Sequence, residues 1–147
     1  MPLRFEPSLM SLQFDPAGDP RRPWVAAAWH ALHNGVLRVY VPPGFRCDLA
    51  SVPDWLMALA PPSGAHQRAA FFHDALYRFQ VCTRTTADAV FDAVMEADGV
   101  PAWRRKLLYL AVRLFGGRAW RANALEVDAA RQALLAQAQH SGKRIDL

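Results

Sequence analysis

Hydrophobic and polar positions follow two different periods along this chain, and the change near residue 45 divides it into two parts. Before that point, short β-branched and aromatic runs are separated by prolines, as in strands and turns. Asn34-Gly35 suits a two-residue turn, so an antiparallel hairpin is predicted between residues 24–32 and 36–41. Beyond residue 45 the apolar positions recur at helical spacing. The pattern predicts an α+β fold, with an N-terminal β-hairpin region packed on about four to five α-helices that dominate the C-terminal part.

Caps and helix breakers mark where each predicted helix begins and ends. The expected helices are a short one opened by Pro53, one from about Ala65 to Phe79 capped by Ser63, one after Thr83–Thr86 that stops at Gly99, one from Pro101 to a break at Gly116-Gly117, and one from about Ala119 to Gln139. Thr85 and Asp88 match a capping box, which gives Asp88 an ordinary role at a helix start. The side chains expected to face the core are Phe72, Leu76, Phe79, Val90, Phe91, Val94, Met95, Trp103, Leu107, Leu110, Ala111 and Leu114.

The composition is that of a packed globular protein. With 52% hydrophobic and 20% charged residues among 147, the chain is long enough to bury a core and differs from disordered sequences. We expect a single domain over residues 1–147, rich in strands and turns over 1–45, helical over 46–140 and ending in a frayed tail at 141–147. No run approaches the ~18 apolar residues of a membrane span, and no signal peptide is recognised. Cys47 and Cys82 lack the spacing of a zinc or redox motif, and a disulfide between them stays open.

The stretch AAFFHDALYR, residues 69–78, places polar side chains inside an apolar helical run. His73 and Tyr77 are four residues apart and are expected to stack on one face of the helix. Asp74 leaves the same turn in another direction. The arrangement suits a general base that is oriented by one neighbour and works beside a metal or an oxyanion. It equally suits a hydrogen-bonded structural knot, because most buried polar groups are simply satisfied.

Further polar side chains are expected near His73 and Tyr77 if the two central helices pack antiparallel. They are Asp48, Ser51, Asp74, Arg84, Asp88 and Asp92. Asp48 and Ser51 belong to the loop before Pro53, where they are either turn and capping residues or an oxygen ligand and a hydroxyl brought to the cluster. The scattered histidines do not suit zinc, whereas carboxylates suit calcium. Asp48, Asp54, Asp74 and Asp88 are therefore candidate oxygen donors to a calcium ion, and Asp48 and Asp74 are the expected ligands.

A row of cations is the second chemical feature of the helical part. No acidic residue occurs between Trp103 and Arg121, and the six cations there are Arg104, Arg105, Lys106, Arg113, Arg118 and Arg121. Together with a net charge of +4, this basic face favours acidic partners such as phosphates, nucleic acid or anionic lipid. It is either a solvated face or a phosphate-binding surface.

The segments FRCDLASVP, AAFFHDALYR, TADAVFDAVM and YLAVRLFGGRAW together resemble a phage and prophage family known only as domain of unknown function 1353. The resemblance covers about Val41 to Trp120. Its residues here are Phe45, Asp48, Ser51, Pro53, His73, Asp74, Tyr77, Arg84, Asp88, Phe91, Met95, Tyr109, Gly116 and Trp120. It implies a bacteriophage or prophage origin and no established biochemical activity. Cys47 departs from the pattern, which has a small polar residue such as threonine there.

A weaker resemblance is to the secreted phospholipases A2, especially the short bacterial type, whose helix carries the motif HDxxY. It implies that His73 activates water, that Asp74 holds calcium, and that Tyr77 and Asp88 fix the histidine. The glycine-rich calcium loop and the disulfides of that family are absent from this sequence. The implied chemistry is ester hydrolysis, in which calcium polarises a carbonyl while imidazole takes a proton from water.

These observations lead to two expectations of function. The first is a phage-encoded accessory protein, associated with the virion or its tail, whose cluster specifies the fold or binds a metal. The alternative is a calcium-assisted hydrolase of envelope lipid or cell-wall material, with His73 as general base. The expected partners are other phage structural proteins, with an anionic lipid or envelope surface as a further possibility, and the expected location is the virion or the host cytoplasm. Nucleic-acid binding ranks below both, because the basic face lacks a stacking platform or a groove-entering motif.

Overall fold

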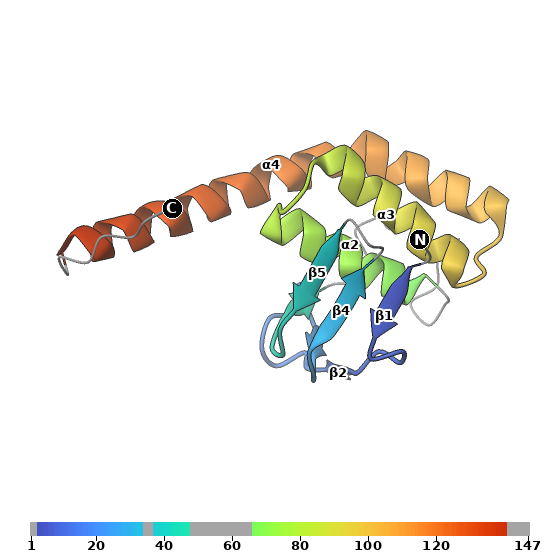
Figure 1. Cartoon of the computed structure of the whole chain (residues 1–147), viewed down its shortest axis with the longest axis horizontal. Helices are drawn as coiled ribbons and strands as arrows, with labels where there is room; N and C mark the ends of the chain where they lie inside the picture. The colour runs from blue at the N-terminus through green and yellow to red at the C-terminus, as the bar shows by residue number, and fades with distance from the viewer. Residues whose placement is uncertain (1–2, 34–36, 48–65, 141–147) are drawn as a thin grey trace.

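In the computed structural model of the chain, the described residues are 3–33, 37–47 and 66–140, with side chains described up to residue 130 and at 132. Strands precede helices in this part of the chain, and Figure 1 shows the strands gathered on one side of the helices. The strands are β1 (Arg4–Glu6), β2 (Leu12–Phe14), β3 (Trp24–Ala26), β4 (His30–His33), β5 (Arg38–Val41) and β6 (Arg46–Cys47). The helices are α2 (Gln67–Phe79), α3 (Arg84–Ala97) and α4 (Ala102–His140). The predicted α+β class is confirmed.

The strands form two small antiparallel sheets, with the orders β1-β4-β5 and β2-β3-β6. The predicted hairpin is present as β4 and β5, in which His30 pairs with Val41 and His33 with Arg38. Residues 24–26, predicted to be part of the same strand, belong instead to the second sheet. The turn at residues 34–36 lies outside the described residues.

His30 explains why the predicted strand 24–32 is divided. This buried side chain donates from Nδ1 to the carbonyl of Ala28 at 2.9 Å, and its Nε2 accepts the N–H of Ser11 at 3.0 Å. Both ring nitrogens are therefore satisfied, and they hold a bend between β3 and β4. A short-range alternation of apolar residues contains no signal for such a bend, because Ser11 is far away in the sequence.

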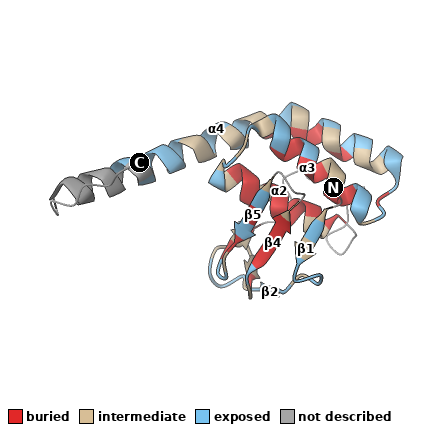
Figure 2. Ribbon diagram, in the orientation of Figure 1, coloured by how far each residue is buried: buried red, intermediate tan, exposed pale blue. Residues whose placement is uncertain are grey.

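The core lies between the helices and the sheets. Helix α2 contacts α3, α4, β5 and β6, and Figure 2 shows buried residues along its inner face. Phe71 and Phe72 are fully buried, and their ring centroids lie 5.3 Å apart in an edge-to-face arrangement. Fully burying one such side chain stabilises the fold by about 1.5–3 kcal/mol. Phe72 and Leu76 face the core as predicted, whereas Phe79 at the helix end is 36% exposed.

The predicted boundaries of the first two described helices are nearly correct. Helix α2 begins at Gln67 rather than Ala65, and Ser63, its predicted cap, lies outside the described residues. Gln80 ends it with a left-handed φ of 50° and an N–H donated to the carbonyl of Leu76. The cap of α3 is Thr83, the first residue of the predicted cap segment Thr83–Thr86, and Gly99 follows the end of the helix with a φ of 76°.

The predicted helix break at Gly116-Gly117 is wrong, because α4 runs through both glycines without interruption. A Cβ added at Gly116 would lie 2.5 Å from Oη of Tyr77. The glycine therefore permits a close approach of α4 to α2 rather than a turn. The described residues contain three helices where about four to five were predicted. The short helix predicted after Pro53 and the tail at 141–147 lie outside the described residues.

The predicted core face of α4 is also wrong. Trp103, Leu107, Leu110 and Leu114 are exposed, the last by 74%. Ala111 is buried as predicted, but its buried companions are Leu108 and Val112. This helix has two overlapping apolar faces. The face that contains the small residues Ala111 and Gly116 can approach α2 and α3 closely, and it is the one that packs. The second half of α4 extends away from the other elements (Figure 1).

Within the described ranges, none of the helices has the length and hydropathy that a membrane-spanning segment requires. The two cysteines are free thiols, with Cys47 buried and Cys82 half-buried.

Candidate functional site

Three helices bring four polar side chains together at one buried point. Asp88 of α3 accepts a hydrogen bond from Oη of Tyr77 at 2.7 Å and contacts Nε2 of His73 at 2.9 Å, both at Oδ1. Its other oxygen, Oδ2, accepts from Nη1 of Arg113 on α4 at 2.9 Å. The side chains of His73 and Asp88 are 1% and 0% exposed. We call these four residues, His73, Tyr77, Asp88 and Arg113, the Asp88 cluster.

Burial and hydrogen bonding act in opposite directions on Asp88. Burial alone would raise the pKa of its carboxyl, but the hydrogen bonds from His73, Tyr77 and Arg113 outweigh it and lower the pKa below the ordinary 3.8. The carboxyl is therefore ionised at neutral pH. Burial, followed by the hydrogen bond to this carboxylate, raises the pKa of Tyr77 above its ordinary value, so the phenol keeps its proton.

The ring of His73 is fixed in position and in tautomer. An ionised carboxylate only accepts hydrogen bonds, so Nε2 carries the hydrogen that faces Asp88. Nδ1 is then the basic nitrogen of the neutral ring. The ring also packs against Tyr77 and Phe91, with centroid separations of 4.2 and 4.9 Å. The predicted stacking of His73 on Tyr77 is confirmed.

The capping role predicted for Asp88 is wrong. Oγ1 of Thr83 accepts the N–H of Thr86 at 3.2 Å, so the cap lies two residues before Thr85, where the predicted capping box begins. Asp88 is left to point from the first turns of α3 toward α2. Asp92, also predicted near His73, lies instead 3.8 Å from Arg105.

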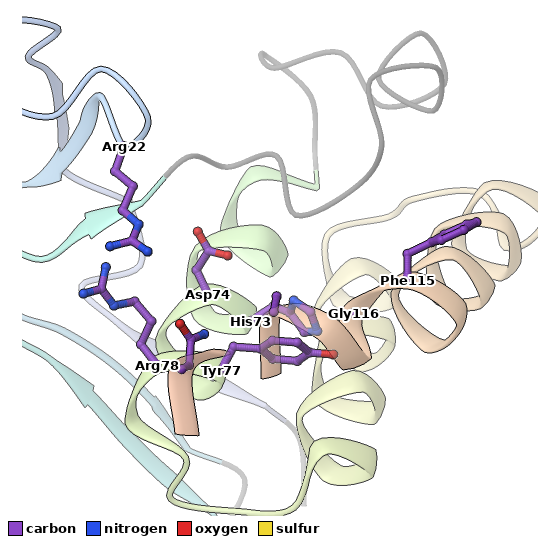
Figure 3. A pocket seen from close by; sticks show the side chains of 9 residues that line it. Arg22, His73, Asp74, Tyr77, Arg78, Phe115 and Gly116 are labelled. Atoms are coloured by element: carbon purple, nitrogen blue, oxygen red, sulfur yellow. The ribbon is translucent and has the colours of Figure 1, made fainter. Parts of the chain in front are cut away.

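A cavity of about 170 Å³ adjoins the Asp88 cluster. The described residues that line it are Arg22, His73, Asp74, Tyr77, Arg78, Phe115, Gly116, Ala119 and Asn123. Figure 3 shows the guanidinium groups of Arg22 and Arg78 pointing toward one another, with Asp74 nearby. Buried imidazole, one carboxylate and two cations therefore share one small space.

The remaining predicted site residues are distributed as follows. Arg84 donates to the main-chain carbonyl of Arg113 at 3.2 Å and so joins α3 to α4 beside the cluster. Asp48 and Ser51 lie outside the described residues. Asp74 lines the cavity, and among the residues that the structure describes no group of three or more histidine, cysteine, aspartate or glutamate side chains is placed to hold a metal.

The predicted basic face does not form one uniform surface. Arg113 binds Asp88, and Arg105 binds Glu96 at 3.0 Å. The guanidinium group of Arg104 lies over the ring of Trp103, 5.3 Å from its centroid. Lys106, Arg118 and Arg121 are exposed. Arg105 and Arg113 therefore neutralise acids of α3 rather than facing solvent as part of a cationic row.

The sequence pattern did not identify several residues of the site, among them Arg113, Arg22 and Arg78. Arg113 was assigned only to the basic face, although a lone cation between Val112 and Leu114 is a signal of a buried partner. Arg22 lies in a proline-rich segment before β3, where the local sequence contains no indication that it reaches a cavity formed by α2 and α4.

The fold and the site define an α+β protein with a buried His-Asp pair beside a cavity that both charged and apolar residues line. Residues 25–112 match a family model described as "Protein of unknown function (DUF1353)". The chain belongs to this family, as the resemblance predicted. It is also 39% identical, over 87 residues, to the uncharacterized protein y4jT of Sinorhizobium fredii (strain NBRC 101917 / NGR234). The matched segment is 56% of this chain and 25% of that protein, so the chain spans about a quarter of that relative. No solved structure matches the chain.

Proposed function

We propose that this protein is a hydrolase in which His73 activates water and Asp88 orients His73. One observation carries the proposal: the histidine bound to Asp88 at 2.9 Å also lines a cavity. A structural histidine needs hydrogen-bond partners but no adjoining space for a substrate. The proposed substrate is an ester of envelope lipid or cell-wall material.

The cluster supplies the requirements of general base catalysis. Nδ1 of His73 takes a proton from water as the water oxygen attacks the ester carbonyl. The carboxylate of Asp88 stabilises the imidazolium ion that forms, and the ring then gives the proton to the leaving alcohol. Tyr77 and Arg113 keep Asp88 ionised and oriented. A positioned base of this kind accelerates a reaction by about 10²–10⁴-fold.

The likeness to HDxxY phospholipases agrees with these roles for His73, Tyr77 and Asp88, and it adds calcium at Asp74. Calcium takes roughly six to eight oxygen ligands. Asp74 is the one carboxylate among the described residues that line the cavity, so these residues do not form a calcium site. The proposed mechanism therefore includes no step through a metal.

Release of fatty acid or alcohol from ester and phospholipid substrates tests the proposal, with and without calcium. We expect His73→Gln to lose about 100-fold or more in rate while it still unfolds cooperatively. The matched control is His30→Gln, which removes another buried histidine with two hydrogen bonds and leaves the cavity intact. Retained hydrolysis in His73→Gln, or equal losses in both variants, contradicts the assignment.

The bond between Arg113 and Asp88 favours a second candidate, a non-enzymatic accessory protein. Arg113 neutralises Asp88 within the fold, as in a polar knot that specifies packing. In that case no ester is cleaved, and changes at His73 lower only the stability. The phage origin and the association with a virion or tail stay predictions of this second candidate.

A further inference from the structure

We propose that Arg22 and Arg78 form a phosphate-binding subsite of the cavity, so that the ligand carries a phosphoryl group. This inference rests on the proposed function for the statement that the ligand is a substrate, but the binding itself does not depend on hydrolysis. Arg22 comes from the segment before β3 and Arg78 from the last turn of α2. Two distant segments thus deliver a cation each to one cavity.

Four half-buried arginines of the described residues, Arg22, Arg78, Arg84 and Arg104, form no ion pair there. Arg84 donates to a main-chain carbonyl and Arg104 lies over the Trp103 ring, whereas Arg22 and Arg78 line the cavity. Arg46, Arg68 and Arg105 each bind a carboxylate, at Asp15, Asp98 and Glu96 respectively. Within the described part of the chain, no ion pair neutralises Arg22 or Arg78, although both are half-buried and Asp74 lines the same cavity. Two adjacent guanidinium groups repel each other, and an anion between them removes that repulsion.

Local contacts hold the side chain of Arg78 and the main chain of Arg22 in place. The guanidinium group of Arg78 lies 5.7 Å from the centroid of the Phe45 ring. The main chain of Arg22 donates to the carbonyl of Asp19 at 2.9 Å and accepts from Nη1 of Arg46 at 3.4 Å. The ligand therefore does not need to order the Arg78 side chain or the Arg22 backbone entirely, which lowers the entropic cost of binding.

The geometry of a guanidinium group selects the ligand class. Its planar set of donors matches the oxygens of phosphate, and a tetrahedral phosphoryl group has enough oxygens to engage two arginines at once. Asn123 of α4 lines the same cavity and adds an amide donor. A phosphate monoester or diester therefore suits the cavity, with its ester carbonyl directed toward His73 in the proposed reaction.

Two probes test the subsite on the full chain: inorganic phosphate, followed by calorimetry, and vesicles of phosphatidylglycerol compared with neutral phosphatidylcholine, followed by sedimentation. We expect Arg22→Gln and Arg78→Gln each to weaken binding of at least one anionic probe by tenfold or more. Arg78→Lys keeps the charge without the planar donors and should lie between wild type and Arg78→Gln. Arg21→Gln, the exposed neighbouring arginine, is the matched control and should bind as wild type does.

The outcomes distinguish a free phosphate ligand from a lipid headgroup, and they test the subsite separately from the proposed hydrolase activity. Loss of phosphate binding in the Arg22 and Arg78 variants identifies a free or small phosphate ligand, and loss confined to phosphatidylglycerol vesicles identifies a lipid headgroup. His73→Gln should bind both probes normally. Wild-type protein that binds the probes but hydrolyses no ester overturns the proposed function alone. Variants of Arg22 and Arg78 that bind as Arg21→Gln does overturn the subsite, whatever the activity at His73.

Discussion

Asp88 receives three side-chain hydrogen bonds at a point without solvent contact, and its ionisation should therefore govern part of the stability. We expect Asp88→Asn to lower the free energy of unfolding by about 1–3 kcal/mol at neutral pH, because a charged acceptor is lost from buried donors. The control is Asp92→Asn one turn further along α3. Asp92 is partly exposed and 3.8 Å from its cation, so its loss should cost about 0–1 kcal/mol.

The lowered pKa of Asp88 makes the free energy of unfolding depend on pH, and it sets the direction of that dependence. The folded chain holds the proton less tightly than the unfolded chain, whose carboxyl titrates near 3.8. The stabilisation is therefore complete above about pH 4 and is lost as the pH falls through the lower folded pKa. We expect the difference in free energy of unfolding between wild type and Asp88→Asn, measured with denaturant, to become smaller below about pH 4. If this difference in free energy stays constant down to about pH 2, Asp88 is not ionised in the folded protein.

At the scale of the helix pair α2 and α4, adjacent glycines offer a matched comparison. Gly116→Ala places a methyl group 2.5 Å from Oη of Tyr77 and should cost about 1–3 kcal/mol through overpacking. Gly117→Ala meets its nearest atoms at 3.6 Å, so it should gain up to about 0.5–1 kcal/mol from helix propensity. Thermal unfolding of both variants measures the difference. Equal effects would show that α4 does not approach α2 closely at Gly116.

The exposed apolar face of α4 gives a second comparison within one element. Leu108 is 1% exposed and Leu110 is 54% exposed. We expect Leu108→Ala to cost about 2–5 kcal/mol, as in other buried leucines. Leu110→Ala should change the stability by less than about 0.5 kcal/mol. The reverse order in denaturant unfolding would mean that the periodicity of the sequence identified the packed face correctly.

At the scale of the whole molecule, Arg68 of α2 joins three parts of the chain. Its guanidinium group binds Asp98 after α3, donates to the carbonyl of Ser8, and lies 4.1 Å from the centroid of the Phe5 ring. Arg68→Gln should lower the free energy of unfolding by about 1–3 kcal/mol, because Asp98 is left buried without its cation. Arg105→Gln, whose partner Glu96 is exposed, should cost about 0–1 kcal/mol. Similar costs in urea titrations of both variants would contradict this linking role.

The sequence alone determined the features that depend on near neighbours. The order of strands and helices, the cap at Thr83 and the end of α3 before Gly99 follow from local propensity and capping. The stacking of His73 on Tyr77 follows from a spacing of four residues on a helix. The closeness of Asp88 to His73 also followed, once antiparallel packing of the two helices was assumed.

Only the tertiary structure decided the features that depend on which surfaces meet. The sequence does not identify Asp88 as the partner of Arg113. It also does not indicate that Arg22 reaches the cavity, or that Leu108 rather than Leu110 faces the core. A glycine pair ends many helices. Here, however, position 116 requires glycine because a Cβ would collide with the side chain of Tyr77 on another helix. The periodicity of the sequence identifies the face of a helix with the most apolar residues. Close packing depends instead on which face has the shape that fits the neighbouring helices. The site therefore depends on contacts between residues that are far apart in the chain.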